Sequence, residues 1–204
     1  MEREKELIYL DSCVLLDHIS LKQGFKKVNT NRKFDISQID ESKAEIFLSY
    51  VNIIEVTEHL KDNIACKKAI EEGYSYFDLR KDVLEQIDIK QEDLEGIDRI
   101  IKTFLSDLPN IITSKEEGIN ASETKKLISI CNTYSMFFID ALHFLIADKQ
   151  GCNIFVTSDA HFIQGLKNLI KDSASTKSIK VMHSKEFKKS VLPRLKRVST
   201  LKSS

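Results

Sequence analysis

The chain has 204 residues, of which 42% are hydrophobic and 30% are charged. This balance is that of an ordinary globular protein and excludes a disordered or fibrous one, and the length fits one domain. Basic and acidic residues are equal in number, at 31 each, which excludes simple electrostatic capture of nucleic acid by the molecule as a whole.

The cysteines and the apolar segments indicate the cellular compartment in which we expect the protein. The four cysteines are isolated, without a CxxC pair, so neither a structural zinc site nor a thioredoxin-like redox motif is indicated. The most apolar segment, 136–147, is interrupted by Asp140 and His143 and is too short to cross a bilayer. We therefore expect a cytoplasmic protein that is neither secreted nor embedded in a membrane.

The first half of the chain begins with two strand–helix pairs. Residues 7–10 form an apolar run that predicts a buried strand, and the apolar spacing after Asp11 predicts a helix. Residues 24–44 are polar and predict a loop. A second strand is expected at 46–48, followed by a helix through 53–60 with Ser49 and Asn52 as possible caps.

The middle of the chain is expected to be helical. From about residue 66 to 108, apolar residues recur at three- and four-residue spacing, which predicts two antiparallel helices joined near 87–91. The part at about 78–108 is expected to be an insert. We interpret its apolar stripe as core, with a dimer or partner surface as the alternative.

The second half alternates again. Gly151 is expected to end the helix at 137–149. The expected strands are 111–113, 153–157 and 179–182, and the expected helices are 121–131, 137–149, 160–169 and 184–191. Such alternation predicts an α/β protein in three layers, α/β/α, around a central parallel sheet of four or five strands. We expect residues 1–192 to form this single domain.

The C-terminal segment is basic. From Lys185 onward, seven basic residues accompany one acidic residue, Glu186. The simplest interpretation is a solvated tail at 193–204, and the alternative is an arm that binds phosphates or a partner.

Four carboxylates adjoin apolar segments: Asp11, Glu55, Asp140 and Asp159. Asp11 and Asp159 each follow an expected strand, and the carboxyl ends of parallel strands meet at one edge of a sheet, where ligands bind. Acids gathered there need a cation to offset their repulsion. Oxygen ligands suit Mg²⁺ or Mn²⁺, and such ions promote phosphodiester hydrolysis.

Three segments carry a family resemblance. LIYLDSCVLLDHI, FLSYVNIIEV and IDALHFLIADKQGCNIFVTSDAHF resemble the PIN-domain family, and in particular the small toxin ribonucleases of toxin–antitoxin pairs. The resemblance implies a metal-dependent endoribonuclease in which Asp11, Glu55, Asp140 and Asp159 are the catalytic, metal-binding acids. It also implies Mg²⁺ or Mn²⁺ as cofactor, RNA as substrate, and an antitoxin protein and a second copy of the chain as partners.

Four further residues are candidates for supporting roles. Ser12 follows Asp11, and Thr157 is placed either to hold water at the site or to satisfy the strand end. Glu58 lies one helical turn after Glu55 and is the alternative to it. For His143, we favour a buried or rim histidine over a metal ligand or a general base.

Three other functions involve some of the same residues. A haloacid dehalogenase phosphatase needs a second aspartate two residues after the first, and that position holds Cys13. A DNA-directed nuclease of the same kind shares the metal chemistry, so only the resemblance favours RNA. A catalytically weak PIN module that binds nucleic acid or protein is the non-enzymatic alternative.

Overall fold

The computed structural model describes residues 5–23, 34–79, 81–108, 111–113, 119–172 and 179–197. The chain divides into two compact units, one formed by Met1–Asn52 with Leu108–Ser204 and the other by Ile53–Asp107. Most of the expected loop, 24–33, and most of the expected basic tail, 198–204, lie outside the described residues.

A parallel sheet of five strands forms the centre of the first unit, in the order β3-β2-β1-β4-β5. The strands are β1 (Glu6–Leu10), β2 (Ala44–Leu48), β3 (Ile111–Thr113), β4 (Ile154–Thr157) and β5 (Lys180–His183). Ile8, Tyr9 and Leu10 are fully buried, as expected for a central strand covered on both faces. The predicted α/β class with a parallel sheet of four or five strands is confirmed.

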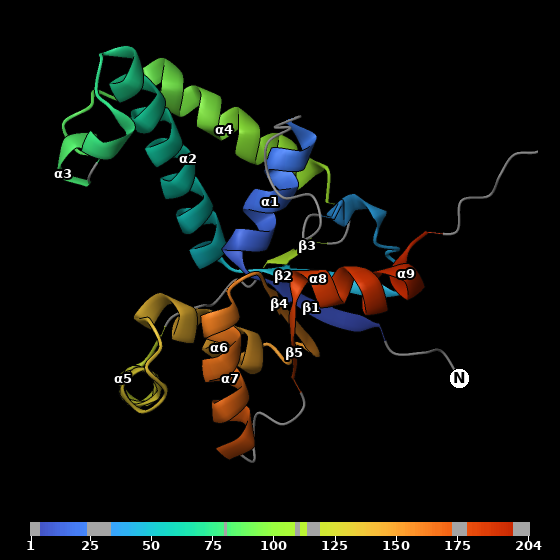
Figure 1. Ribbon diagram of the computed structural model, residues 1–204. Helices are drawn as coiled ribbons and strands as arrows, with labels where there is room; N and C mark the ends of the chain where they lie inside the picture. Colours follow the sequence, from blue (N-terminus) through green and yellow to red (C-terminus); the bar gives the residue numbers. More distant parts are fainter. Residues whose placement is uncertain are drawn as a thin grey trace, which may run out of the picture. The chain divides into compact units, whose positions relative to one another are not determined.

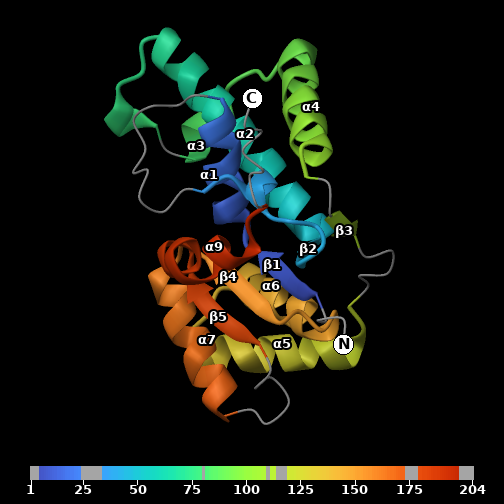
Figure 2. The same ribbon diagram turned by 90° about the vertical axis from the view of Figure 1, so that its right-hand side faces the viewer.

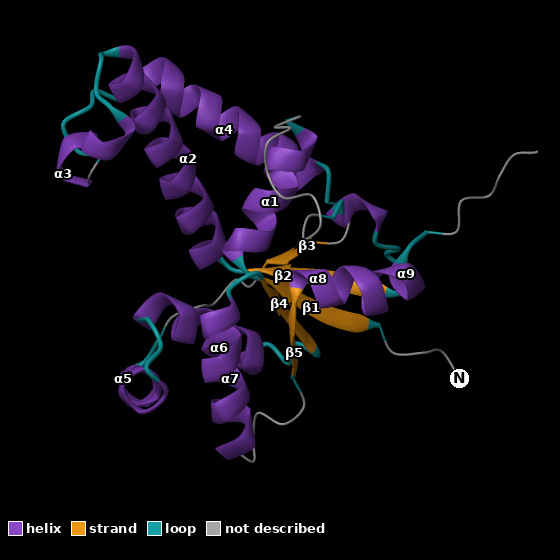
Figure 3. Cartoon of the chain, viewed as in Figure 1, coloured by secondary structure: helices purple, strands orange, loops and turns teal. Residues whose placement is uncertain are grey.

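Helices cover both faces of this sheet, which confirms the three-layer arrangement. Figures 1 and 2 show α1 (Ser12–Lys22) over one face. The other face carries α5 (Ala121–Tyr134), α6 (Phe138–Lys149) and α7 (Ala160–Asp172), and Figure 3 shows the strands gathered between the helices. Gly151, at a φ of 70°, ends α6 as its position in the sequence predicts.

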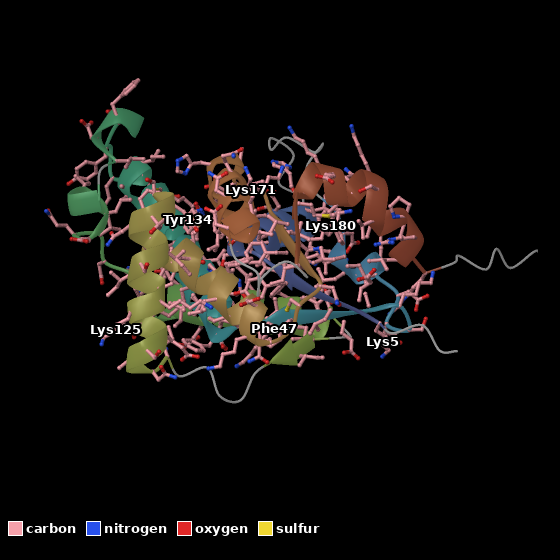
Figure 4. All side chains as sticks on the ribbon, turned by 90° about the horizontal axis from the view of Figure 1, so that it is seen from below. Lys5, Phe47, Lys125, Tyr134, Lys171 and Lys180 are labelled. Carbon is pink, nitrogen blue, oxygen red and sulfur yellow. The ribbon has the colours of Figure 1, made fainter. Side chains whose placement is uncertain are left out.

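One hydrophobic core lies between the sheet and α5, α6 and α7. The rings of Tyr9 and Phe155 stack at 5.1 Å between centroids, and Phe162 meets Phe155 edge-on at 5.6 Å. Tyr134 on α5, labelled in Figure 4, donates a hydrogen bond from its hydroxyl to Asp172 on α7 at 3.3 Å. Buried aromatic pairs such as Tyr9–Phe155 and Phe155–Phe162 contribute about 0.5–1.5 kcal/mol each beyond their burial.

The C-terminal helix is longer and less regular than predicted. Instead of one helix at 184–191, the chain forms α8 (Ser184–Glu186), the π-helical turn η3 (Phe187–Val191) and α9 (Leu192–Leu195). The Leu195 carbonyl accepts from the Asp40 amide at 2.7 Å, and the Arg197 amide donates to Gln38, in η1 (Ile36–Gln38), at 3.2 Å. The first residues of the expected tail are therefore hydrogen-bonded through their backbone to the segment that contains Gln38 and Asp40.

The second unit contains most of α2 (Tyr50–Glu71), together with η2 (Tyr76–Asp78), α3 (Lys81–Leu84) and α4 (Gln91–Ser106). Ala65, Ala69 and Ile87 form its small core. The predicted separate helices at 53–60 and from 66 are wrong, because no glycine or proline interrupts 50–72 and the helix ends only before Gly73, at a φ of 97°. The break between α3 and α4 confirms the predicted join near 87–91. The predicted first helix, from about 66 to that join, is wrong, because α2 ends at Glu71 and only the short η2 and α3 follow it.

Among the described residues, no helix combines the length and apolarity needed to cross a membrane. The expected helical insert at about 78–108 falls mostly within this second unit.

Candidate metal centre

Asp11 stands where β1 ends and α1 begins. Its backbone is extended, with φ −63° and ψ 151°, and its amide donates to the Val156 carbonyl of β4 at 2.9 Å. The carboxylate caps α1, since Oδ1 accepts from the Ser12 amide at 2.8 Å. The side chain is only 7% exposed. A buried carboxylate is therefore held at the carboxyl ends of the two central strands.

The second carboxylate oxygen of Asp11 is also bonded. Oδ2 accepts from the Thr157 hydroxyl at 2.6 Å and from the Cys13 thiol at 3.0 Å. The Cys13 sulfur in turn accepts from the Ser158 amide at 3.1 Å. Burial, and then the charge of Asp11, raise the pKa of the Cys13 thiol well above its usual range, so the thiol stays protonated and remains a donor. These bonds fix the orientation of the carboxylate.

His143 lies on α6 with its ring close to Asp11. Nδ1 is 2.6 Å from the hydroxyl oxygen of Tyr9, which is also 2.9 Å from the Ser49 hydroxyl. A ring nitrogen of His143 and a carboxylate oxygen of Asp11 lie within 4.8 Å of one another. His143 is 1% exposed, in line with the expectation of a buried histidine. A buried imidazole therefore lies beside the buried carboxylate of Asp11.

The start of α2 is fixed to the same end of the sheet. Ser49 and Asn52 cap this helix reciprocally: the Asn52 amide donates to Ser49 Oγ at 3.2 Å, and the Ser49 amide donates to Asn52 Oδ1 at 2.9 Å. The Asn52 side chain then donates to the Leu10 carbonyl and to Ser12 Oγ, each at 3.2 Å. Ser12 is thus held by the residue that caps α2.

Glu55 and Glu58 follow in α2. Glu55 is partly buried and lies three residues after Asn52, on the same side of the helix. Glu58 is exposed and pairs with Lys61 at 3.0 Å. Of the two glutamates, Glu55 is closer along the helix to the residue that contacts the end of β1.

Asp159 and Asp140 have different surroundings. Asp159 is exposed and caps α7, because Oδ1 accepts from the amides of His161 at 2.8 Å and Phe162 at 2.9 Å. Asp140 is half-buried in the first turn of α6, and its charge, after burial, raises the pKa of the Cys131 thiol. Across the described parts of the chain, neither aspartate belongs to a set of three or more metal-binding side chains whose donor atoms lie within 4.8 Å of one another.

The bonds around Asp11 include residues that the sequence analysis did not single out. Tyr9 and Cys13 lie two residues to either side of Asp11 and bond to His143 and to Asp11 itself. The alternation of side chains along a strand places Tyr9 and Asp11 on the same face, which was a usable signal for Tyr9. Cys13 carried no signal, because its role depends on Ser158, which is 145 positions away along the chain.

Comparison with known proteins yields little for this chain. No family model matches it, and no curated protein matches it. One solved structure, the crystal structure of PAE2754 from Pyrobaculum aerophilum, is 14% identical, with a TM-score of 0.46 over 96% of this chain and 98% of that one.

Proposed function

We propose that the chain is a PIN-like endoribonuclease that hydrolyses RNA phosphodiester bonds with Mg²⁺ or Mn²⁺. The observation that carries this proposal is the buried carboxylate of Asp11, held at the carboxyl end of the central strand beside the imidazole of His143. That edge is where parallel α/β sheets bind their ligands. The resemblance of three segments to the PIN family supports the same assignment.

Asp11 and His143, whose donor atoms lie within 4.8 Å of one another, are proposed metal ligands, and Glu55 is proposed with them because the PIN resemblance implies it. Asp11 is oriented through both of its carboxylate oxygens, and Glu55 follows Asn52, whose side chain contacts Ser12. Two carboxylates and an imidazole are a donor set that accepts Mn²⁺, and the carboxylates alone suit Mg²⁺. When bound, such an ion supplies the charge that activates water and offsets the charge on the phosphodiester group.

The remaining candidates act around this centre. Thr157 bonds to Asp11 through its hydroxyl and accepts the Asp159 amide at 3.1 Å, so it aligns the ends of β1 and β4. Asp140 and Asp159 are proposed to complete the acidic edge, as the PIN resemblance implies. Orientation of ligands by such supporting bonds affects metal affinity by about 10- to 100-fold.

The finer parts of the proposal rest on the resemblance alone. These are the choice of RNA over DNA, the role as the toxin of a toxin–antitoxin pair, the protein antitoxin as partner, and pairing with a second copy of the chain. Each can fail while the metal-dependent nuclease activity stands.

The test is cleavage of structured and single-stranded RNAs and DNAs by the parent, Asp11→Asn and a control, Glu45→Gln. Glu45 lies in β2 and forms an ion pair with Lys5, so the control removes one charge from the same sheet. Reactions contain Mn²⁺, Mg²⁺ or excess chelator. We expect metal-dependent cleavage of RNA by the parent and the control, and cleavage slowed about 100-fold or more by Asp11→Asn.

Other outcomes separate the alternatives. Cleavage of DNA in preference to RNA would indicate the DNA-directed nuclease. Metal binding without cleavage of any substrate would favour the binding module. Cleavage by Asp11→Asn as fast as by the parent would overturn the site.

A further inference from the structure

We infer that His143 is itself a ligand of the metal ion, through Nε2, and that Tyr9, Ser49 and Asn52 hold its ring in the tautomer that coordination requires. The inference rests on the proposed function for its metal ion. It assigns His143 a role that the acidic residues of the resemblance do not cover. Three features of the described residues support it: burial, proximity and the direction of a chain of hydrogen bonds.

His143 occupies an apolar part of α6. Its neighbours Leu142 and Phe144 are buried, and His143 is 1% exposed. A buried polar ring is costly unless its nitrogens are bonded, and Nδ1 is bonded to Tyr9. A ring nitrogen within 4.8 Å of the Asp11 carboxylate is close enough for one ion to contact both groups, because ligand distances for such ions are about 2.0–2.2 Å on each side.

The hydrogen bonds determine which nitrogen carries the proton. The side chain of Asn52 is oriented by two backbone contacts: its Oδ1 accepts the Ser49 amide, and its Nδ2 donates to the Leu10 carbonyl. Oδ1 can only accept, so the Ser49 hydroxyl, 3.1 Å away, donates its proton to Asn52. The Ser49 oxygen is therefore left as the acceptor for Tyr9.

The same reasoning extends to His143. The hydroxyl of Tyr9 donates to Ser49 over 2.9 Å, and its oxygen then accepts from His143 Nδ1 over 2.6 Å. Nδ1 consequently carries the proton, and in the neutral ring Nε2 carries the lone pair that coordinates metals. Metal-binding histidines commonly donate their second nitrogen to such a partner, which fixes the orientation of the ring.

This ligand set affects the choice of metal. Mg²⁺ binds oxygen atoms almost exclusively, whereas Mn²⁺ lies further along the affinity series for nitrogen ligands. A centre with one imidazole among carboxylates is therefore expected to prefer Mn²⁺ to Mg²⁺. Loss of the imidazole should lower the affinity for Mn²⁺ more than the affinity for Mg²⁺.

The experiment observes the nitrogen directly. The full chain is loaded with Mn²⁺, and electron spin echo spectra of the ion are recorded for protein with natural histidine and with ¹⁵N-labelled histidine. We expect imidazole nitrogen coupling that changes with the label, which requires no substitution. His143→Gln should abolish the coupling, and His161→Gln, which removes an exposed imidazole beside Asp159, should retain it.

Binding of the two metals is then measured by calorimetry. We expect His143→Gln to lower the ratio of Mn²⁺ to Mg²⁺ affinity about tenfold or more, and Tyr9→Phe to weaken Mn²⁺ binding about 10- to 100-fold while the nitrogen coupling remains. Both variants are checked for folding by circular dichroism, and the labelled parent gives an answer even if a variant does not fold.

The outcomes distinguish this inference from the proposed function. Mn²⁺-dependent cleavage without histidine coupling would overturn the role of His143 and leave the nuclease standing. Histidine coupling without cleavage of any nucleic acid would support the ligand and overturn the nuclease. Absence of binding of both Mn²⁺ and Mg²⁺ would overturn both.

Discussion

The two ends of the β1–β4 strand pair place their polar side chains in different kinds of contact. At the amino ends, the Asn153 side chain accepts a hydrogen bond from the Leu7 amide at 2.7 Å. A side chain there supplies the acceptor for a backbone amide. At the carboxyl ends, Asp11 accepts from the side chains of Thr157 and Cys13. Polar groups at the amino ends serve strand pairing, whereas those at the carboxyl ends orient one carboxylate. This difference separates a structural end of the sheet from a candidate active end.

The two aspartates at the carboxyl ends differ from each other in exposure and in hydrogen bonding. Asp11 is 7% exposed and is bonded through both oxygens, whereas Asp159 is exposed and uses Oδ1 to cap α7. Both follow neighbouring strands, so their positions in the chain are equivalent. The burial and the bonding partners single out Asp11 as the central ligand of the proposed centre.

The largest expected effect distinguishes these two aspartates. Asp11→Asn removes the proposed metal ligand and should slow cleavage about 100-fold or more, since several kcal/mol of charge stabilisation are lost. Asp159→Asn retains the cap, because asparagine caps helices as well as aspartate does. We expect its rate to stay at least tenfold above that of Asp11→Asn in the same assay. Equal losses would mean that the two aspartates contribute alike.

A second substitution tests the hydroxyl that joins the two strand ends. Thr157→Val removes the donor to Asp11 and the acceptor of the Asp159 amide while keeping the shape of the side chain. We expect the free energy of unfolding to fall by about 1–3 kcal/mol, because buried groups lose their partners. Urea denaturation measures this, and Thr157→Ser, which keeps the hydroxyl, should lose much less. A valine variant as stable as the serine variant would contradict the bond.

The amino end is tested by Asn153→Ala. The Leu7 amide loses its acceptor, so we expect a loss of about 1 kcal/mol in the free energy of unfolding. Mn²⁺ affinity should be unchanged, since this end of the sheet holds no proposed ligand. Asn153→Asp keeps the acceptor oxygen and is the matched control. A change in Mn²⁺ affinity without a loss of stability would reverse the assignment of the two ends.

The smallest effect concerns pH at the amino end of β4. Burial raises the pKa of the Cys152 thiol to about 12. In the unfolded chain this thiol ionises near pH 9, so its contribution to stability is complete below that pH and is lost as pH rises from about 9 towards 12. Between pH 9 and 10 we expect the parent to lose about 1 kcal/mol more than Cys152→Ala. Parallel pH profiles in urea denaturation would show that Cys152 ionises freely in the folded protein.

Much of the fold was accessible from local patterns. The runs of branched and aromatic residues in β1, β2 and β4 identified buried strands, and their alternation with helices identified the parallel sheet. Errors arose where local signals were weak. The full length of α2 was not recognised, because its low amphipathicity leaves little periodicity between 60 and 66, and the π-helical turn of η3 has no clear pattern in the sequence.

The candidate site could be predicted only in part from the sequence. Asp11 was found because it ends a strand, and Thr157 because it precedes Asp159. The chain of bonds from Asn52 through Ser49 and Tyr9 to His143 was not foreseen, since Tyr9 lies 40 positions from Ser49 and 134 from His143. No local pattern reports contacts at such separations.

The sequence by itself determined the fold class and the strand ends at which the acids stand, because alternating hydrophobic runs set the secondary structure and parallel strands gather their carboxyl ends. Only the tertiary structure decided that Asp11 is buried and bonded through both oxygens, that Asp159 caps a helix, and that His143 approaches Asp11 with Nδ1 committed to Tyr9. Those differences depend on burial and on hydrogen-bond direction between distant segments, which arise only when the sheet and its helices pack together.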